Sequence, residues 1–214
     1  MEQKVGRILL FTVKACPIGR SMGKVLSEIA LRFPDIKIDT FYVEEDIHET
    51  NQYRIKQHPT VLFLDHQGKE LYRAEGFAET DEITRIIEKI NLNEINQVPD
   101  YDENQSTIEK YKIYLFKAGT PVPIEIEYKN ATGVKAPRIT AVRLLLETRL
   151  DHYENPFPAE TVFELIQFEG DCAIITLRVN KEIQPADMKK MELALLKTLS
   201  AFGIKEVKLI INLN

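Results

Sequence analysis

Hydrophobic positions in residues 1–92 follow two patterns: short apolar or alternating runs, and longer stretches with apolar residues at helical spacing. The short runs are typical of strands, and the longer stretches are typical of helices with one face on a core. Strands are predicted at 8–11, 35–43, 58–64 and 69–74, and helices at 17–33, within 44–56 and at 80–90. Residues 65–68 have the composition of a hairpin turn between the last two strands. The predicted order is β-α-β-α-β-β-α.

Two of these helices carry more detailed predictions. Thr80 is expected to be the N-cap of the closing helix, because a threonine hydroxyl can accept an N–H of the first turn. The apolar face of that helix is formed by Ile83, Ile86, Ile87 and Ile90. In the short polar helix within 44–56, the residues expected to point inward are Ile47, Tyr53 and Ile55.

The pattern restarts after residue 110. Strands are predicted at 112–117, 123–128, 163–167, 173–179 and 207–211, and helices at 137–150 and 185–202. The order β-β-α-β-β-α-β indicates an α+β sandwich with the helices over one sheet face. The apolar stripe of the second helix is expected to be core, and Leu150 is the last inward residue predicted for the first. Cys172 falls on the face opposite the core, with Thr176 and Arg178.

Residues 93–110 separate the two patterns. They carry five acidic residues and one basic residue, and their few apolar residues show no sustained period. Such a composition is typical of a connector. We therefore expect the fold class to be α/β plus α+β, with one domain at 1–92, an acidic linker at 93–110 and a second domain at 111–214.

Composition narrows the classes of function. The formal charge of −5 over 214 residues and a pI near 5.5 argue against a general nucleic-acid-binding protein. The apolar run near the start is too short for a signal peptide or a membrane span, so a cytoplasmic location is expected. Two distant cysteines do not make a disulfide framework, and the four histidines show no metal-ligand spacing. We expect neither a metal nor another cofactor.

Cys16 lies where the first strand ends and the first helix begins. The unpaired N–H groups and the positive dipole end of a helix favour a thiolate over a thiol at such a point. A dithiol site of the Cys-x-x-Cys type needs a second cysteine at position 19, which is glycine. Two interpretations remain open: Cys16 is a reactive thiol, or it is a small packed hydrophobic residue.

The order of elements, the sequence Cys16-Pro17-Ile18-Gly19 and the segment 53–64, followed by Gly68 and Gly76, resemble the thioredoxin superfamily over residues 5–92. The resemblance implies a cis proline that faces the active cysteine, with a preceding residue whose backbone binds an extended peptide. Pro59 and His58 match these positions, and we predict that the bond between them is cis. The implied site consists of Cys16 as a tentative nucleophile, with Pro17, Gly19, Arg20, His58, Pro59, Thr60 and Gly76 for binding.

The chain also departs from that superfamily. Gly19 stands in place of the resolving cysteine, Leu10 stands about where thioredoxins keep a buried acid, and the chain contains no tryptophan. An ordinary disulfide reductase is therefore not expected. His58 is either a general base near Cys16 or a side chain that points to solvent. Arg20 either stabilises a thiolate or is an ordinary surface arginine.

Residues 111–214 resemble the GerMN domain of bacterial sporulation and spore-germination proteins. The resemblance is carried by the strand 111–116, the helix segment 141–147, the break 155–159, the hairpin at 169–173, the second helix and the closing segment 204–211. It implies protein–protein assembly or ligand binding, and the family has no established catalytic residues. Members are commonly secreted or membrane-anchored, unlike the location expected here.

Two hypotheses of function follow. The first is a bacterial binding or assembly protein linked to sporulation or germination, which holds an extended peptide of a protein partner in a groove beside Pro59. The second is a monothiol thiol-disulfide oxidoreductase or sensor in which Cys16 attacks a disulfide and an external thiol resolves the product. The exposed edge strand expected in the second domain would support a homo-oligomer. Neither hypothesis involves nucleic acid or a membrane span.

Overall fold

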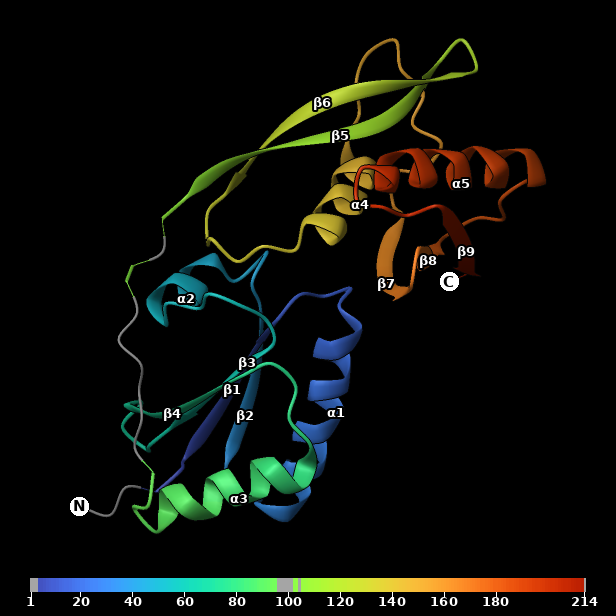
Figure 1. Ribbon diagram of the computed structural model, residues 1–214. Helices are drawn as coiled ribbons and strands as arrows, with labels where there is room; N and C mark the ends of the chain where they lie inside the picture. Colours follow the sequence, from blue (N-terminus) through green and yellow to red (C-terminus); the bar gives the residue numbers. More distant parts are fainter. Residues whose placement is uncertain (1–3, 96–101, 104, 214) are drawn as a thin grey trace. The chain divides into compact units, whose positions relative to one another are not determined.

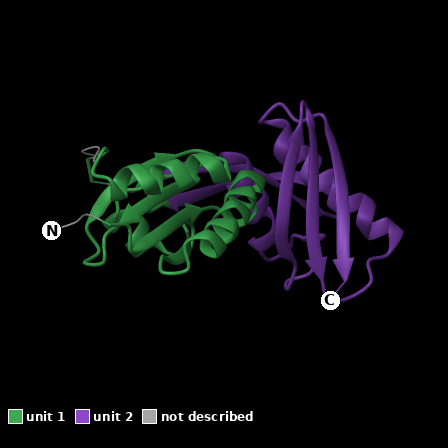
Figure 2. Ribbon diagram, turned by 90° about the horizontal axis from the view of Figure 1, so that it is seen from below, with its two compact units in different colours: residues 1–107, 130–135 green, residues 108–129, 136–214 purple. Residues whose placement is uncertain are grey.

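The computed structural model describes residues 4–95, 102–103 and 105–213 (Figure 1). The chain forms two compact units (Figure 2): unit 1 comprises residues 1–107 and 130–135, and unit 2 comprises residues 108–129 and 136–214. Part of the acidic linker predicted at 93–110 falls on 96–101 and 104, which lie outside the described residues. Within the described ranges, no helix is both long and apolar enough to cross a membrane.

Unit 1 contains every element predicted for residues 1–92. In chain order these are β1 (Arg7–Thr12), α1 (Pro17–Arg32), β2 (Lys37–Tyr42), α2 (Ile47–Gln52), β3 (Thr60–Leu64), β4 (Glu70–Glu75) and α3 (Thr80–Asn91). The strands form one sheet in the order β2-β1-β3-β4. β1 pairs parallel with β2 and antiparallel with β3, and β3 pairs antiparallel with β4. The hairpin predicted between the last two strands is confirmed.

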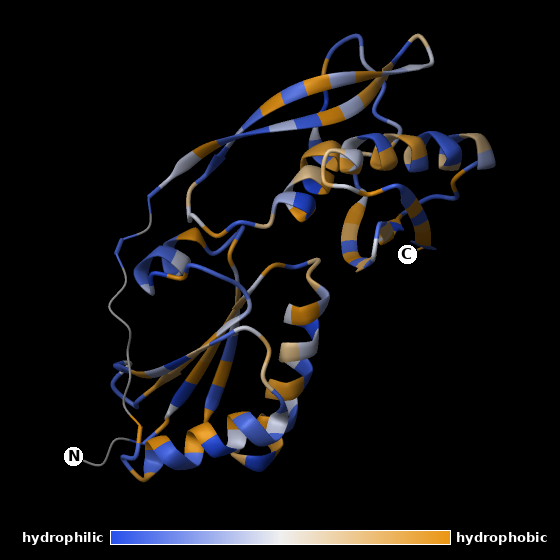
Figure 3. Cartoon of the chain, viewed as in Figure 1, coloured by the Kyte–Doolittle hydropathy of each residue, from blue (hydrophilic) through white to orange (hydrophobic). Residues whose placement is uncertain are grey.

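β1 and β3 are central strands buried on both faces, which explains their nearly continuous apolar runs. One face of the sheet packs on α1 and α3, whose apolar and polar residues alternate along each helix (Figure 3). Ile8, Phe63, Met22, Ile29 and Ile87 lie in this core. The amphipathic period of the helices therefore determines which face of each helix packs on the sheet.

Two local predictions in unit 1 are wrong. Glu79, not Thr80, is the N-cap of α3, and the Thr80 hydroxyl instead donates to the Glu28 carboxylate at 2.6 Å. Ile47 is exposed rather than inward, because it is the first residue of a helix of six residues that buries only Thr50. Ile55 is fully buried, as predicted.

A loop at 130–135 completes unit 1 although its sequence neighbours belong to unit 2. The side-chain oxygen of Asn130 accepts the N–H groups of Thr132 and Gly133, each at 3.1 Å. The Asn130 side-chain amide donates to the Val134 carbonyl at 2.9 Å, so one asparagine closes the loop. Asn51 of α2 donates to the Ala131 carbonyl at 3.2 Å.

Unit 2 contains the elements predicted for its part of the chain, with longer strands. They are β5 (Thr107–Lys117, whose first residue is assigned to unit 1), β6 (Thr120–Asn130, whose last residue is too), α4 (Pro137–Glu147), β7 (Val162–Glu169), β8 (Cys172–Val179), α5 (Pro185–Ser200) and β9 (Glu206–Leu213). The strands form two sheets, β5-β6 and β7-β8-β9, where one was expected. β5 does not join the larger sheet, and its Tyr114 N–H donates to the Thr198 hydroxyl of α5 at 3.1 Å.

The helix predicted at 137–150 is shorter than expected. α4 ends at Glu147, and Leu150 is exposed rather than inward. The Asn155 side chain donates to the carbonyls of Leu145 and Thr148, at 2.7 and 2.9 Å. These bonds satisfy carbonyl groups at the helix end, which therefore have no need of a further turn.

The sheet β7-β8-β9 packs one face against α4 and α5 (Figure 2). Ala173, Ile175 and Leu177 of β8 are fully buried on this face. Ile174, Thr176 and Arg178 alternate with them on the other face, which agrees with the predicted phase of this strand. Cys172 also has that phase, and it is buried.

Candidate functional site

Strand pairing brings the predicted site residues to one end of the strands of the unit 1 sheet, and this end is the edge at which the candidate site lies. Since β3 pairs antiparallel with both β1 and β4, the end of β1, the start of β3 and the end of β4 lie at the same edge. Cys16 follows β1, Pro59 directly precedes β3, and Gly76 directly follows β4. Residues distant in the sequence therefore gather at the edge where α1 begins.

Cys16 is the N-cap residue of α1, in an extended conformation with φ −79° and ψ 121°. Its N–H donates to the Val13 carbonyl at 3.0 Å, and its own carbonyl accepts the Arg20 N–H at 3.0 Å. Pro17 occupies the first turn, where a missing N–H has no cost. The thiol is free and the residue is only 6% exposed. The predicted position at a strand-to-helix boundary is confirmed, and the side chain is packed.

Gly19 packs directly against Thr12, the last residue of β1. A Cβ atom added to Gly19 would lie 1.7 Å from the Thr12 Oγ1 atom and 2.9 Å from its Cβ atom. No side chain fits at position 19 unless Thr12 moves. The Thr12 hydroxyl is itself buried without a hydrogen-bond partner among the described residues. The position that carries a second thiol in a Cys-x-x-Cys site is therefore closed by a neighbouring strand.

The peptide bond between His58 and Pro59 is cis, as predicted. The Pro59 carbonyl accepts the Gly76 N–H at 2.8 Å, and Gly76 has a φ of +87°, which favours glycine. Thr60 is fully buried, and its hydroxyl donates to the Gln57 carbonyl at 2.9 Å. These bonds fix the backbone on both sides of Pro59.

His58 is half-buried, and its Nδ1 atom is buried without a hydrogen-bond partner among the described residues. Burial lowers the pKa of the His58 imidazole below its ordinary value of 6.5. The ring is therefore neutral at neutral pH. No hydrogen bond joins His58 to Cys16 in the described part of the chain, so a general-base role for His58 stays a prediction.

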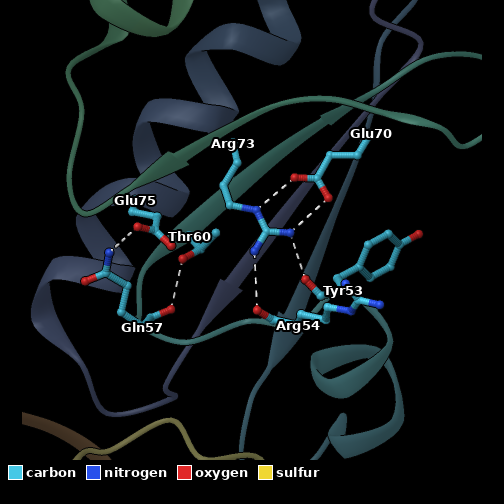
Figure 4. A network of polar contacts seen from close by, with 7 residues as sticks. All are labelled: Tyr53, Arg54, Gln57, Thr60, Glu70, Arg73 and Glu75. Carbon is cyan, nitrogen blue, oxygen red and sulfur yellow. Dashed lines mark hydrogen bonds and ion pairs between the residues drawn. The ribbon is translucent and has the colours of Figure 1, made fainter. Parts of the chain in front are cut away.

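Arg73 ties the loop before Pro59 to β4 (Figure 4). Its side chain is only 3% exposed and forms a bidentate ion pair with Glu70, at 2.8 Å from Nε and 2.9 Å from Nη2. The guanidinium also donates to the carbonyls of Tyr53 and Arg54, at 2.8 and 3.3 Å. The planar fork of arginine suits this arrangement, in which one cation satisfies a carboxylate and two carbonyls.

A second contact of the same loop lies closer to Pro59 (Figure 4). The Gln57 side-chain amide donates to the Glu75 carboxylate at 2.5 Å. Together with the contacts of Arg73, this contact links residues 53–57 to β4 at two positions, Arg73 and Glu75. The loop that presents His58 and Pro59 is therefore held by the sheet.

Three residues of this edge were missed by the sequence interpretation. Thr12 closes position 19, Arg73 anchors the loop, and the Glu44 carboxylate accepts the Lys14 N–H at 2.9 Å before Cys16. An arginine beside apolar residues in β4, with a glutamate before it, is a signal for a buried pair. No comparable signal marks Thr12, because its importance depends on the packing of α1 on β1.

The remaining candidates occupy ordinary positions. Arg20 is exposed on the first turn of α1, and Pro17 is half-buried. Within the described ranges, no group of three or more His, Cys, Asp and Glu side chains is placed to hold a metal ion. The chemistry that this edge offers is therefore a single packed thiol beside a fixed backbone.

Comparison with known proteins gives similarity to part of the chain. No protein-family model matches, and no curated protein matches. A chloroplastic thioredoxin z is 22% identical, with 42% of this chain and 80% of that chain covered and a TM-score of 0.37. Mitochondrial thioredoxin 3 of Saccharomyces cerevisiae is 17% identical, with 41% of this chain and 81% of that chain covered and a TM-score of 0.36. The thioredoxin of Fasciola hepatica is 19% identical, with 41% of this chain and 82% of that chain covered and a TM-score of 0.37.

Replacement of Arg73 is expected to destabilise unit 1 strongly. Arg73→Met leaves the Glu70 carboxylate and two carbonyls without their partner, and breaking such a buried pair costs about 3–5 kcal/mol. Urea unfolding of the full chain by circular dichroism measures the change. Arg85→Met, on the exposed side of α3, is the control and should change stability by less than about 0.5 kcal/mol. Equal effects of the two variants would contradict the assigned role.

Gly19 and Gly23 both lie in α1, and replacing each by alanine tests whether position 19 is closed to a side chain. A Cβ atom at Gly23 meets nothing within 4 Å, so Gly23→Ala should stabilise the protein by about 0.5–1 kcal/mol through helix propensity. Gly19→Ala should instead destabilise it by about 1–3 kcal/mol, because the new methyl group overlaps Thr12. Urea unfolding compares them. If Gly19→Ala stabilises the protein as much as Gly23→Ala does, position 19 is not closed.

Proposed function

We propose that unit 1 is a thioredoxin-like binding domain that has lost dithiol chemistry and holds a segment of a protein partner beside Pro59. The observation that carries this proposal is the contact of Gly19 with Thr12, which leaves no room for a resolving thiol. The low exposure of Cys16 is in keeping with it, because thiol chemistry requires access to the sulfur. Such a site is suited to binding without turnover.

The exposed side chains near this edge support the same proposal. Ile18, in the first turn of α1, is 52% exposed, and Phe77, directly after Gly76, is 49% exposed. A single exposed apolar residue needs no explanation, but these two adjoin the fixed backbone at Cys16 and Pro59. An extended peptide would bury both side chains while its backbone lies along residues 58–59.

The anchored loop favours affinity. The bonds from Arg73, Gln57 and Gly76 hold the backbone around Pro59 before a partner arrives. Binding then does not require that loop to be ordered, which lowers the entropic cost of association. The neutral imidazole of His58 adds no charge to be desolvated.

For unit 2 we propose a GerMN-like role in protein assembly during sporulation or germination, in the cytoplasm of a bacterium. The sequence pattern of residues 111–214 supports this assignment. Under the proposal, unit 1 captures a partner segment and unit 2 supplies the second contact of an assembly.

A second candidate is monothiol redox chemistry, favoured by the position of the free thiol of Cys16 at the start of α1. In that reaction the Cys16 thiolate attacks a partner disulfide, and one partner sulfur leaves as a thiolate. An external thiolate then attacks the mixed disulfide and releases the Cys16 thiolate. The chain needs no second cysteine for either step.

Partner capture from lysate distinguishes the two candidates. The immobilised full chain and its Cys16→Ser variant are expected to capture the same proteins, identified by mass spectrometry. Phe77→Asp is expected to lose them, because it places a charge on the proposed contact surface. Leu31→Asp is the matched control: Leu31 is exposed and apolar but lies at the other end of α1, so this variant should retain the partners.

Two results would contradict binding without turnover. Capture that requires Cys16 and is released by a reductant would favour the redox candidate. Capture lost equally in Phe77→Asp and Leu31→Asp would show that the surface beside Pro59 is not the contact.

A further inference from the structure

Edge strands present unpaired backbone N–H and C=O groups, and proteins usually protect them with prolines, charges, bulges or short length. Most edges of this chain carry such protection. β6 contains Pro121 and Pro123, and β7 pairs with β8 through a register shift between Phe163 and Leu165. β2 has only six residues, and its Asp39 is paired with Arg7.

β9 lacks most of these features, and its two charged residues, Glu206 and Lys208, stand in its first three positions. Its eight residues, Glu206–Leu213, include no proline or glycine, and they pair with β8 in a parallel register that has no shift. In the part of the chain that the structure describes, the backbone of 207–213 makes no hydrogen bond outside its sheet. Ile210 is 46% exposed and Leu213 is 61% exposed. The strand is therefore a long, regular and partly apolar edge.

The sequence of β9 is complementary to itself. Side chains alternate between the two faces of a sheet, so antiparallel pairing of two copies must match residues of the same face. A two-fold axis at Ile210 does so along the whole of 207–213. It places Leu209 opposite Ile211, Val207 opposite Leu213, Lys208 opposite Asn212, and Ile210 opposite its own copy.

Other axes fit less well. An axis at Lys208 sets two lysines opposite each other, which is unfavourable for a cross-strand pair. An axis between two residues sets Lys208 opposite an apolar residue of the other face. An axis at Leu209 leaves Leu213 unpaired within the strand and sets Lys208 opposite Ile210. The axis at Ile210 therefore pairs most of the strand without opposing like charges.

We infer that two copies of this chain associate through β9, in antiparallel pairing about a two-fold axis at Ile210. The interface joins two three-stranded sheets into one sheet of six strands. It is isologous, since the same strand contributes to both sides, as in most homodimers. The backbone groups of the β9 edge find partners, and Ile210 is covered by its own copy.

Charge exchange at position 210 tests this inference. Light scattering of the full chain over a concentration series should give twice the 24.7 kDa of one chain. Ile210→Lys and Ile210→Glu should each give a monomer, because like charges then face each other across the axis. An equimolar mixture of the two variants should restore the dimer mass, which also shows that both variants are folded.

Thr176→Lys is the matched control, because Thr176 is the β8 neighbour of Ile210 on the same face but not at the edge. It should leave the dimer intact. The inference is overturned if the wild-type chain is monomeric throughout, or if the mixture of the two Ile210 variants stays monomeric. It is also overturned if Thr176→Lys dissociates the dimer as fully as Ile210→Lys. The two copies would then associate through the face of the sheet and not through the β9 edge.

Discussion

The contact between Gly19 and Thr12 decides what the first turn of α1 can do. It places the Thr12 side chain of β1 where a side chain at position 19, the fourth residue of a Cys-x-x-Cys site, would otherwise point. The packing of α1 on the sheet, and with it the position of Cys16, depends on this close approach. A helix that lies so near its strand leaves room for one thiol and no second one. The constraint separates this site from dithiol sites before any question of reactivity arises.

The other half of the site depends on Arg73. Its buried guanidinium is satisfied by the Glu70 carboxylate and by the carbonyls of the loop at 53–54. A buried cation without these partners would be very unfavourable, so the charge specifies where the loop must lie. The loop then delivers His58 and Pro59 to the edge where Cys16 is held by α1. Helix packing and a buried ion pair thus position the two halves independently.

The sequence predicted the elements well because each has its own period. It also predicted the strand-to-helix position of Cys16 and the cis bond before Pro59. Its predictions failed where a residue far away in the sequence determines the local structure. Thr80 loses its expected capping role because its hydroxyl binds Glu28 of another helix. β5 and β6 form a sheet of their own, and the hydrogen bond from β5 to α5 is a contact that no local pattern reveals. The closure of position 19 likewise appears only when α1 is packed on β1.

The most direct test of the account is the rate at which Cys16 is alkylated in the native full chain, read by mass spectrometry with Cys172 as the internal comparison. The two residues are 6% and 8% exposed, so a site built for binding predicts that both react slowly and at similar rates. After denaturation both should react quickly. Fast reaction of native Cys16 while Cys172 stays protected would contradict the account and assign the site to thiol chemistry.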